Sequence, residues 1–107
     1  MKRPGALGAP SELSLTFVGD AIEEEAQGCV FNLSLAGCTI RSHTSVPARN
    51  FLRIVIHDAN GPITIPMAVV RWAAPHQFGV DFLIIPTQER AKLTELVWGL
   101  PRCCAPF

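Results

Sequence analysis

The residues of this chain best suited to bind a polar ligand lie at 32–37, which read Asn32-Leu33-Ser34-Leu35-Ala36-Gly37 and are called the corner below. Asn32 and Ser34 are separated by one residue, so an extended chain presents their amide and hydroxyl groups to the same side. Gly37 permits a positive φ angle or a close approach of another backbone. The same residue types also favour a hydrogen-bonded turn. The residues alone therefore leave two interpretations open, a ligand site at a strand end and a turn.

The segments around the corner have the pattern of a small β-protein. Leu13, Leu15 and Phe17 alternate with polar residues, which is typical of a strand with one buried face. Pro66 cannot donate a ladder hydrogen bond, so its strand should be bulged or at an edge there. The acidic run 23–25 is expected in an exposed hairpin loop, either as a solvated turn or as a cation or partner site. We expect strands at 13–17, 28–32, 37–41, 51–57, 63–72 and 78–83.

A single helix is predicted after the last strand. Thr87 is a suitable N-cap and Glu89 lies in the first turn, where a carboxylate favours the helix dipole. Ala91, Leu93, Leu96 and Val97 form an apolar stripe, and Gly99 followed by Pro101 ends the helix. The expected fold is mainly β, a small six-stranded antiparallel barrel with a C-terminal α-helix.

Composition limits the classes of function. The 107 residues suit one small domain, with a flexible arm at 1–10, a barrel with its helix at 11–98 and a tail at 99–107. Nine Lys and Arg residues balance nine Asp and Glu residues, so non-specific binding to nucleic acid or to anionic membranes is not expected. No apolar run reaches the ~18 residues of a membrane helix, and no signal peptide is evident. The expected location is the cytoplasm.

Spacing indicates neither a catalytic centre nor a metal site, and an enzyme is not expected. No cysteine belongs to a C-x-x-C motif, and no paired histidines accompany the cysteines. Cys29 and Cys38 are expected to be small reduced core residues, whereas Cys103 and Cys104 form either a redox or metal handle or an incidental pair in the tail. Trp72 and Phe78 suit either a stacking platform or the barrel core. The three histidines show no spacing typical of nucleophilic catalysis: His43, His57 and His76.

Several local patterns together resemble the PilZ domain family over about 13–98. The corner looks like the family's D/N-x-S-x-x-G motif, and the apolar strand 38–40 follows it. The segments 69–72 and 79–82, which read VVRW and GVDF, are similar to the family's V-x-W and G-V-x-F pair. A helix beginning near Thr87 is the last shared feature. The resemblance implies a six-stranded barrel that commonly binds the bacterial second messenger cyclic di-GMP, with no resident cofactor.

The resemblance also implies a set of ligand-binding residues. Asn32 and Ser34 would hydrogen-bond the guanine or the phosphate, Gly37 would let the backbone approach, and Arg3 would clamp the ligand from the arm. The family's second motif is R-x-x-x-R in that arm, and here Leu7 occupies the second arginine position. A guanidinium makes charge-assisted hydrogen bonds worth roughly 1.5–3 kcal/mol each, which leucine cannot make. The chain is therefore expected to be a degenerate member.

Arg41 and Arg71 lie outside the arm. Two interpretations are open for them: an approach to the ligand-binding face, or a role as solvated surface residues. The leading hypothesis is a PilZ-type signalling domain with weak or conditional binding of cyclic di-GMP, acting through conformation or a protein partner. The alternative is an adaptor that keeps the fold without the ligand, in motility, pilus or polysaccharide regulation, with 97–107 as a docking segment. A third hypothesis, an oligonucleotide-binding barrel, is disfavoured by the balanced charge and the absence of tyrosine.

Overall fold

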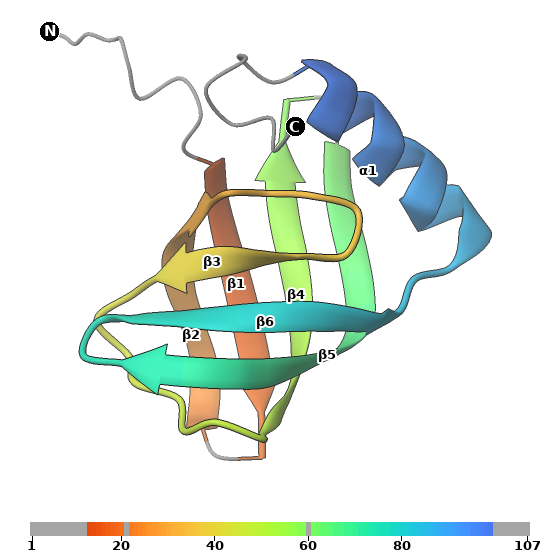
Figure 1. The fold of residues 1–107 in the computed structure, drawn as a ribbon. Helices are drawn as coiled ribbons and strands as arrows, with labels where there is room; N and C mark the ends of the chain where they lie inside the picture. Colours follow the sequence, from red (N-terminus) through yellow and green to blue (C-terminus); the bar gives the residue numbers. More distant parts are fainter. Residues whose placement is uncertain (1–12, 21, 60, 100–107) are drawn as a thin grey trace, which may run out of the picture.

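The computed structural model describes residues 13–20, 22–59 and 61–99, which form six strands and one helix. This arrangement confirms the predicted barrel and terminal helix. All neighbouring strands are antiparallel, and the barrel closes in the order β1-β2-β3-β6-β5-β4 (Figure 1). The elements are β1 (Leu13–Gly19), β2 (Ile22–Phe31), β3 (Gly37–Arg41), β4 (Phe51–Asp58), β5 (Gly61–Ala74), β6 (Gln77–Ile84) and α1 (Thr87–Gly99).

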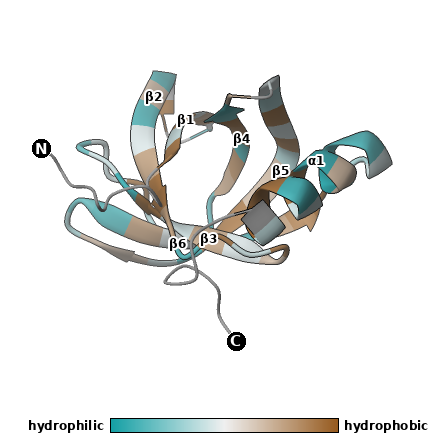
Figure 2. Cartoon of the chain, turned by 90° about the horizontal axis from the view of Figure 1, so that it is seen from above, coloured by the Kyte–Doolittle hydropathy of each residue, from teal (hydrophilic) through white to brown (hydrophobic). Residues whose placement is uncertain are grey.

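The core lies inside the barrel because alternate residues of each strand point inward. Leu15 and Phe17 of β1 are almost fully buried, as are Ile54 and Ile56 of β4, whereas the residues between them are more exposed. The rings of Phe17 and Phe78 meet edge to face, with centroids 5.4 Å apart. Figure 2 looks down on the barrel and shows β2, β1, β4 and β5 as its curved wall, closed by β3 and β6.

Pro66 lies at a β-bulge, as its missing N–H predicts. Leu52 pairs with Ala68 and Ile54 with Ile65, so Pro66 and Met67 together oppose a single residue of β4. Beyond this point β5 also pairs with β6, beginning at Met67. Figure 1 shows β5 changing direction between these two partners. The proline therefore stands where the strand bends to close the barrel.

Four details of the predicted elements were wrong. The acidic run 23–25 belongs to β2, opposite a register shift in β1, rather than to the hairpin loop. Ala91 is exposed, so the buried face of α1 is made by Leu93, with Leu96 and Val97 partly buried. The Pro86 carbonyl accepts the first helical hydrogen bond, from the Arg90 N–H at 2.8 Å, so Thr87 is inside the helix rather than its N-cap. Every strand except β3 also extends beyond at least one of its expected ends, and β2 begins six residues earlier than expected.

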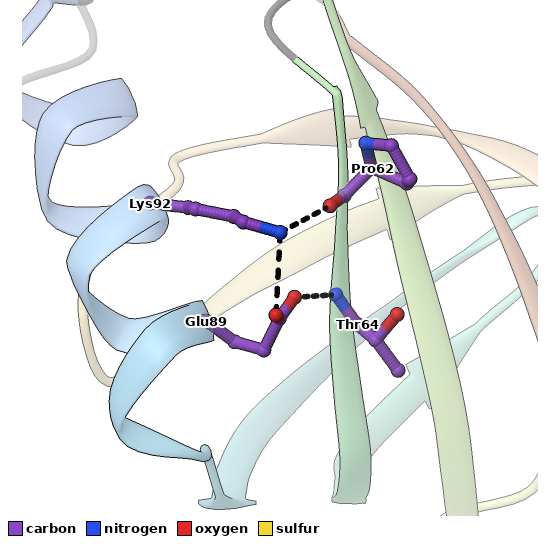
Figure 3. A network of polar contacts seen from close by, with 4 residues as sticks. All are labelled: Pro62, Thr64, Glu89 and Lys92. Atoms are coloured by element: carbon purple, nitrogen blue, oxygen red, sulfur yellow. Dashed lines mark hydrogen bonds and ion pairs between the residues drawn. The ribbon is translucent and has the colours of Figure 1, made fainter.

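Helix α1 covers a stretch of β5 that β6 does not reach. Glu89 Oε1 accepts a hydrogen bond from the Thr64 N–H at 2.7 Å, and Lys92 Nζ lies 3.3 Å from Glu89 Oε2 and 3.5 Å from the Pro62 carbonyl oxygen (Figure 3). These contacts satisfy backbone groups on the side of the strand that faces away from β4. The helix thus protects an edge that would otherwise be open to pairing with another chain.

The Thr64 N–H is also the main reason that the pKa of Glu89 lies below its ordinary value, with Lys92 acting in the same direction. A carboxylate whose pKa is lowered by folding stabilises the native state above its unfolded-state pKa, and this contribution is lost as the pH falls through the lowered value. We therefore expect Glu89→Gln to lower the urea midpoint at pH 7, and the difference from the wild type to shrink below about pH 4.5. Chemical denaturation across this pH range measures the effect.

Glu95→Gln is the matched control, because Glu95 is an exposed residue of the same helix. It should leave the urea midpoint nearly unchanged at every pH. A constant difference between Glu89→Gln and the wild type from pH 7 down to pH 3 would contradict the role assigned to the Glu89 charge.

Candidate functional site

The corner connects β2 to β3 beside β6, and its first residue reverses the chain. Asn32 has a φ angle of 50°, a left-handed conformation that asparagine adopts more readily than most residues. Leu33 is 2 % exposed and anchors the segment in the core. The Asn32 side chain is exposed, and it makes no hydrogen bond within the described part of the chain. Its amide is therefore available to a ligand.

Ser34, in contrast, is fully engaged in the turn. Its hydroxyl donates to the Gly37 carbonyl at 3.2 Å and accepts from the N–H groups of Ala36 at 3.1 Å and Gly37 at 3.3 Å. A serine hydroxyl has one donor and two acceptor positions, so these contacts use all of them. Each interpretation of the corner thus applies to a different residue. Ser34 forms the turn, whereas the Asn32 side chain has no hydrogen-bond partner within the described part of the chain.

Gly37 is needed for close packing rather than for a positive φ angle. A Cβ atom at this position would overlap the Val80 carbonyl oxygen and lie 3.2 Å from the Asp81 Cα atom. Next to it, the Ala36 carbonyl accepts a hydrogen bond from the Phe82 N–H at 2.8 Å. The corner is therefore seated directly on the backbone of β6.

The two arginines near the corner have different partners. The Arg71 side chain forms an ion pair with Asp81, with Nε and Oδ2 3.2 Å apart. The Arg41 guanidinium lies 4.3 Å from the ring centroid of Phe31, the residue just before Asn32. No carboxylate partner of Arg41 exists among the described residues. The Arg41 guanidinium is thus an unneutralised cation next to Phe31, whereas Arg3 and Leu7 lie outside the described residues.

Trp72 and Phe78 occupy opposite faces of the wall. Phe78 is 1 % exposed and belongs to the core, whereas Trp72 is 44 % exposed. Trp72 pairs with Gly79, where a Cβ atom would overlap the indole Nε1. The tryptophan therefore requires the glycine on the neighbouring strand. Only Phe78 matches the core interpretation, and Trp72 remains on the outer surface.

The sequence predicted the positions of the cysteines and histidines in the fold only in part. Cys38 is buried, and burial raises the pKa of its thiol to about 12, so it is an inert core residue as predicted. Cys29 is only half-buried, and Cys103 and Cys104 lie outside the described residues. Among the described residues, no group of three or more His, Cys, Asp or Glu side chains is arranged to hold a metal ion. The three histidines, which show no pattern in the sequence, line a single cavity with Cys29.

The structure thus defines a class of small β-domain, a closed six-stranded antiparallel barrel with a terminal helix, in which the turn at 32–37 lies against β6. A sequence model of the PilZ domain matches residues 8–98, so this chain belongs to the PilZ domain family. PilZ domains are non-catalytic binding domains and are generally cyclic di-GMP signalling domains.

A solved structure supports the fold assignment. The chain is similar to the crystal structure of the PilZ domain of CeSA from a cellulose-synthesizing bacterium, with a TM-score of 0.66 and 14 % sequence identity over 84 % of this chain and 93 % of that one. No curated protein matches the chain. Within the described residues, no helix is long and apolar enough to cross a membrane.

Proposed function

We propose that this chain is a cyclic di-GMP signalling domain whose nucleotide binding is weak or conditional, and which acts by changing its conformation or its contact with a protein partner. The observation that carries the proposal is the exposed, unpartnered amide of Asn32 at the family's motif position. Arg41, held over the Phe31 ring beside it, provides a cation for a phosphate or a guanine base. Together they form part of a nucleotide site.

Weak binding follows from the groups that are already engaged or missing. The Ser34 hydroxyl would have to leave the turn to contact a ligand. Arg71 is neutralised by Asp81. Leu7 replaces the second arginine of the arm motif. Each missing charge-assisted hydrogen bond lowers the affinity by about tenfold to a hundredfold.

Calorimetry with cyclic di-GMP tests the proposal. The wild type is expected to bind with a dissociation constant of the order of 10–100 μM, and Asn32→Ala is expected to weaken binding by about tenfold because it removes the free amide. Leu7→Arg restores the arm motif and should strengthen binding by about tenfold or more.

Glu95→Gln is the control for these variants, because it changes an exposed helix residue that is not part of the corner. Binding that is absent at about 100 μM ligand in both the wild type and Leu7→Arg would rule out the nucleotide role. Binding that does not respond to Asn32→Ala would remove the corner from the site.

Exposed apolar side chains favour a second candidate, an adaptor with a PilZ fold that no longer binds the nucleotide and acts in motility, pilus or polysaccharide regulation. Met67 and Ile84 are register partners on β5 and β6, and they are 38 % and 50 % exposed. Trp98, near the end of α1, is 80 % exposed and belongs to the predicted docking segment 97–107, most of which lies outside the described residues. Tight binding of cyclic di-GMP that depends on Asn32 would exclude this candidate.

A further inference from the structure

A cavity of about 510 Å³ opens on the outer surface of the barrel, at the end of β3 opposite to the corner. It extends across outward-facing residues of β1 and β2 to the segment that follows β3. No residue of the corner lines it, although every histidine of the chain does. Its lining includes Cys29, Arg41, Ser42, His43, His57 and His76.

Backbone contacts between two distant segments bring the histidines together. The Ser42 N–H donates to the His76 carbonyl at 2.9 Å, which joins the β3–β4 loop to the β5–β6 turn, and these two segments lie side by side in Figure 1. The buried Ser42 hydroxyl donates to the Gln27 carbonyl at 2.5 Å and accepts from the Thr44 N–H at 3.1 Å, which fixes the loop against β2. The histidine positions are therefore set by the barrel.

Two of the histidines face each other with free ring nitrogens. The rings of His43 and His76 lie 5.9 Å apart, centroid to centroid, in an edge-to-face arrangement. Neither ring makes a hydrogen bond within the described part of the chain. His57 approaches from β4, where its Nε2 lies 3.4 Å from the Thr16 hydroxyl oxygen. The cavity thus receives imidazole groups from three separate segments.

Apart from the Cys29 thiol, the ionisable groups that line the cavity are basic. Arg41 and the three histidines line it, and no Asp or Glu is among its described lining residues. These basic groups are concentrated at the cavity, although the formal net charge of the whole chain is +0. Donors converging from several sides suit an anion with several oxygen atoms, and the volume is within the roughly 300–1,000 Å³ of small-molecule sites.

We infer that this histidine cavity binds the phosphate group of a small ligand. The site contains no residue of the corner and shares only Arg41 with the proposed nucleotide site, and it does not rest on the nucleotide role. A phosphate has more acceptor oxygens than a carboxylate, so it can accept hydrogen bonds from His43 and His76 and still offer an oxygen to a further donor of the lining, such as Arg41. Its occupation would link the β3–β4 loop to the β5–β6 turn more firmly.

Nuclear magnetic resonance titration of the full chain with pyrophosphate tests this inference. We expect saturable shifts of the backbone amides of Ser42, His43 and His76, with a dissociation constant of about 1 mM or lower. The amides of Asn32 and Ser34 should not shift. Sodium acetate should bind at least about tenfold more weakly, because a carboxylate offers only two oxygens.

The double variant His43→Gln with His76→Asn should weaken pyrophosphate binding by about tenfold or more. Asparagine is chosen at 76 because His76 has a φ angle of 65°, which asparagine tolerates. Arg53→Gln is the control, since Arg53 is an exposed cation on β4 outside the cavity lining, and it should leave binding unchanged.

Several outcomes would overturn the inference. These are the absence of saturable wild-type shifts up to about 10 mM pyrophosphate, equal responses to acetate, or shifts produced only by zinc chloride. If the double variant does not fold, the amide shifts of the wild type on addition of pyrophosphate still test the inference. Asn32→Ala should leave pyrophosphate binding intact, so failure of the nucleotide proposal and failure of this one are distinguishable.

Discussion

Replacing Gly37 with alanine is expected to lower the free energy of unfolding by about 3 kcal/mol, the upper end of the usual cost of overpacking. The added methyl group would overlap the Val80 carbonyl oxygen and press on the Asp81 Cα atom. Both obstacles are backbone atoms of β6, so no side-chain rotation relieves the contact. The pair of strands β3 and β6 would have to separate. Urea denaturation of the two proteins without nucleotide measures the difference.

Ala36→Ser provides the comparison for Gly37→Ala. Ala36 is exposed in the same loop, and its hydrogen bond to β6 uses only the backbone. We expect the free energy of unfolding of Ala36→Ser to stay within about 0.5 kcal/mol of the wild-type value. If Gly37→Ala were equally mild, the glycine of the motif would be needed for ligand approach alone, and its packing role would be wrong.

Phe78→Ala is expected to be the most destabilising core substitution, at about 3–5 kcal/mol. Phe78 is 1 % exposed and contacts Phe17 across the barrel interior, so its removal leaves a cavity between strands that cannot all collapse inward. Because small domains are stable by only about 5–15 kcal/mol, this single change removes a large share of the total. Thermal and urea unfolding both measure it.

Two phenylalanine variants separate burial from aromatic character. Phe51→Ala removes a ring that is 54 % exposed and should cost less than about 1 kcal/mol. Phe78→Leu keeps most of the buried volume and should cost about 1–2 kcal/mol, which also covers the case in which Phe78→Ala does not fold. Equal losses at positions 51 and 78 would contradict the assignment of Phe78 to the core.

Much of the fold was predictable because strand periodicity depends on local residue order. Alternating apolar residues such as Leu15, Phe17, Ile54 and Ile56 define the inner faces, and Pro66 marked its bulge. The acidic run 23–25 was misplaced because charge alone does not distinguish a loop from a solvated strand. Its position in β2 depends on how far β1 extends as a pairing partner, which is not a local property.

The candidate site shows a similar division. The sequence by itself determined the fold class, and it led to the hypothesis that Asn32, Ser34 and Gly37 are motif residues and that Leu7 stands at an arginine position. Only the tertiary structure decided that the Ser34 hydroxyl is engaged in the turn and that Gly37 lies against β6. It also decided that His43, His57 and His76 line one cavity. Contacts between distant segments follow from strand register and barrel closure, which no spacing along a single chain specifies.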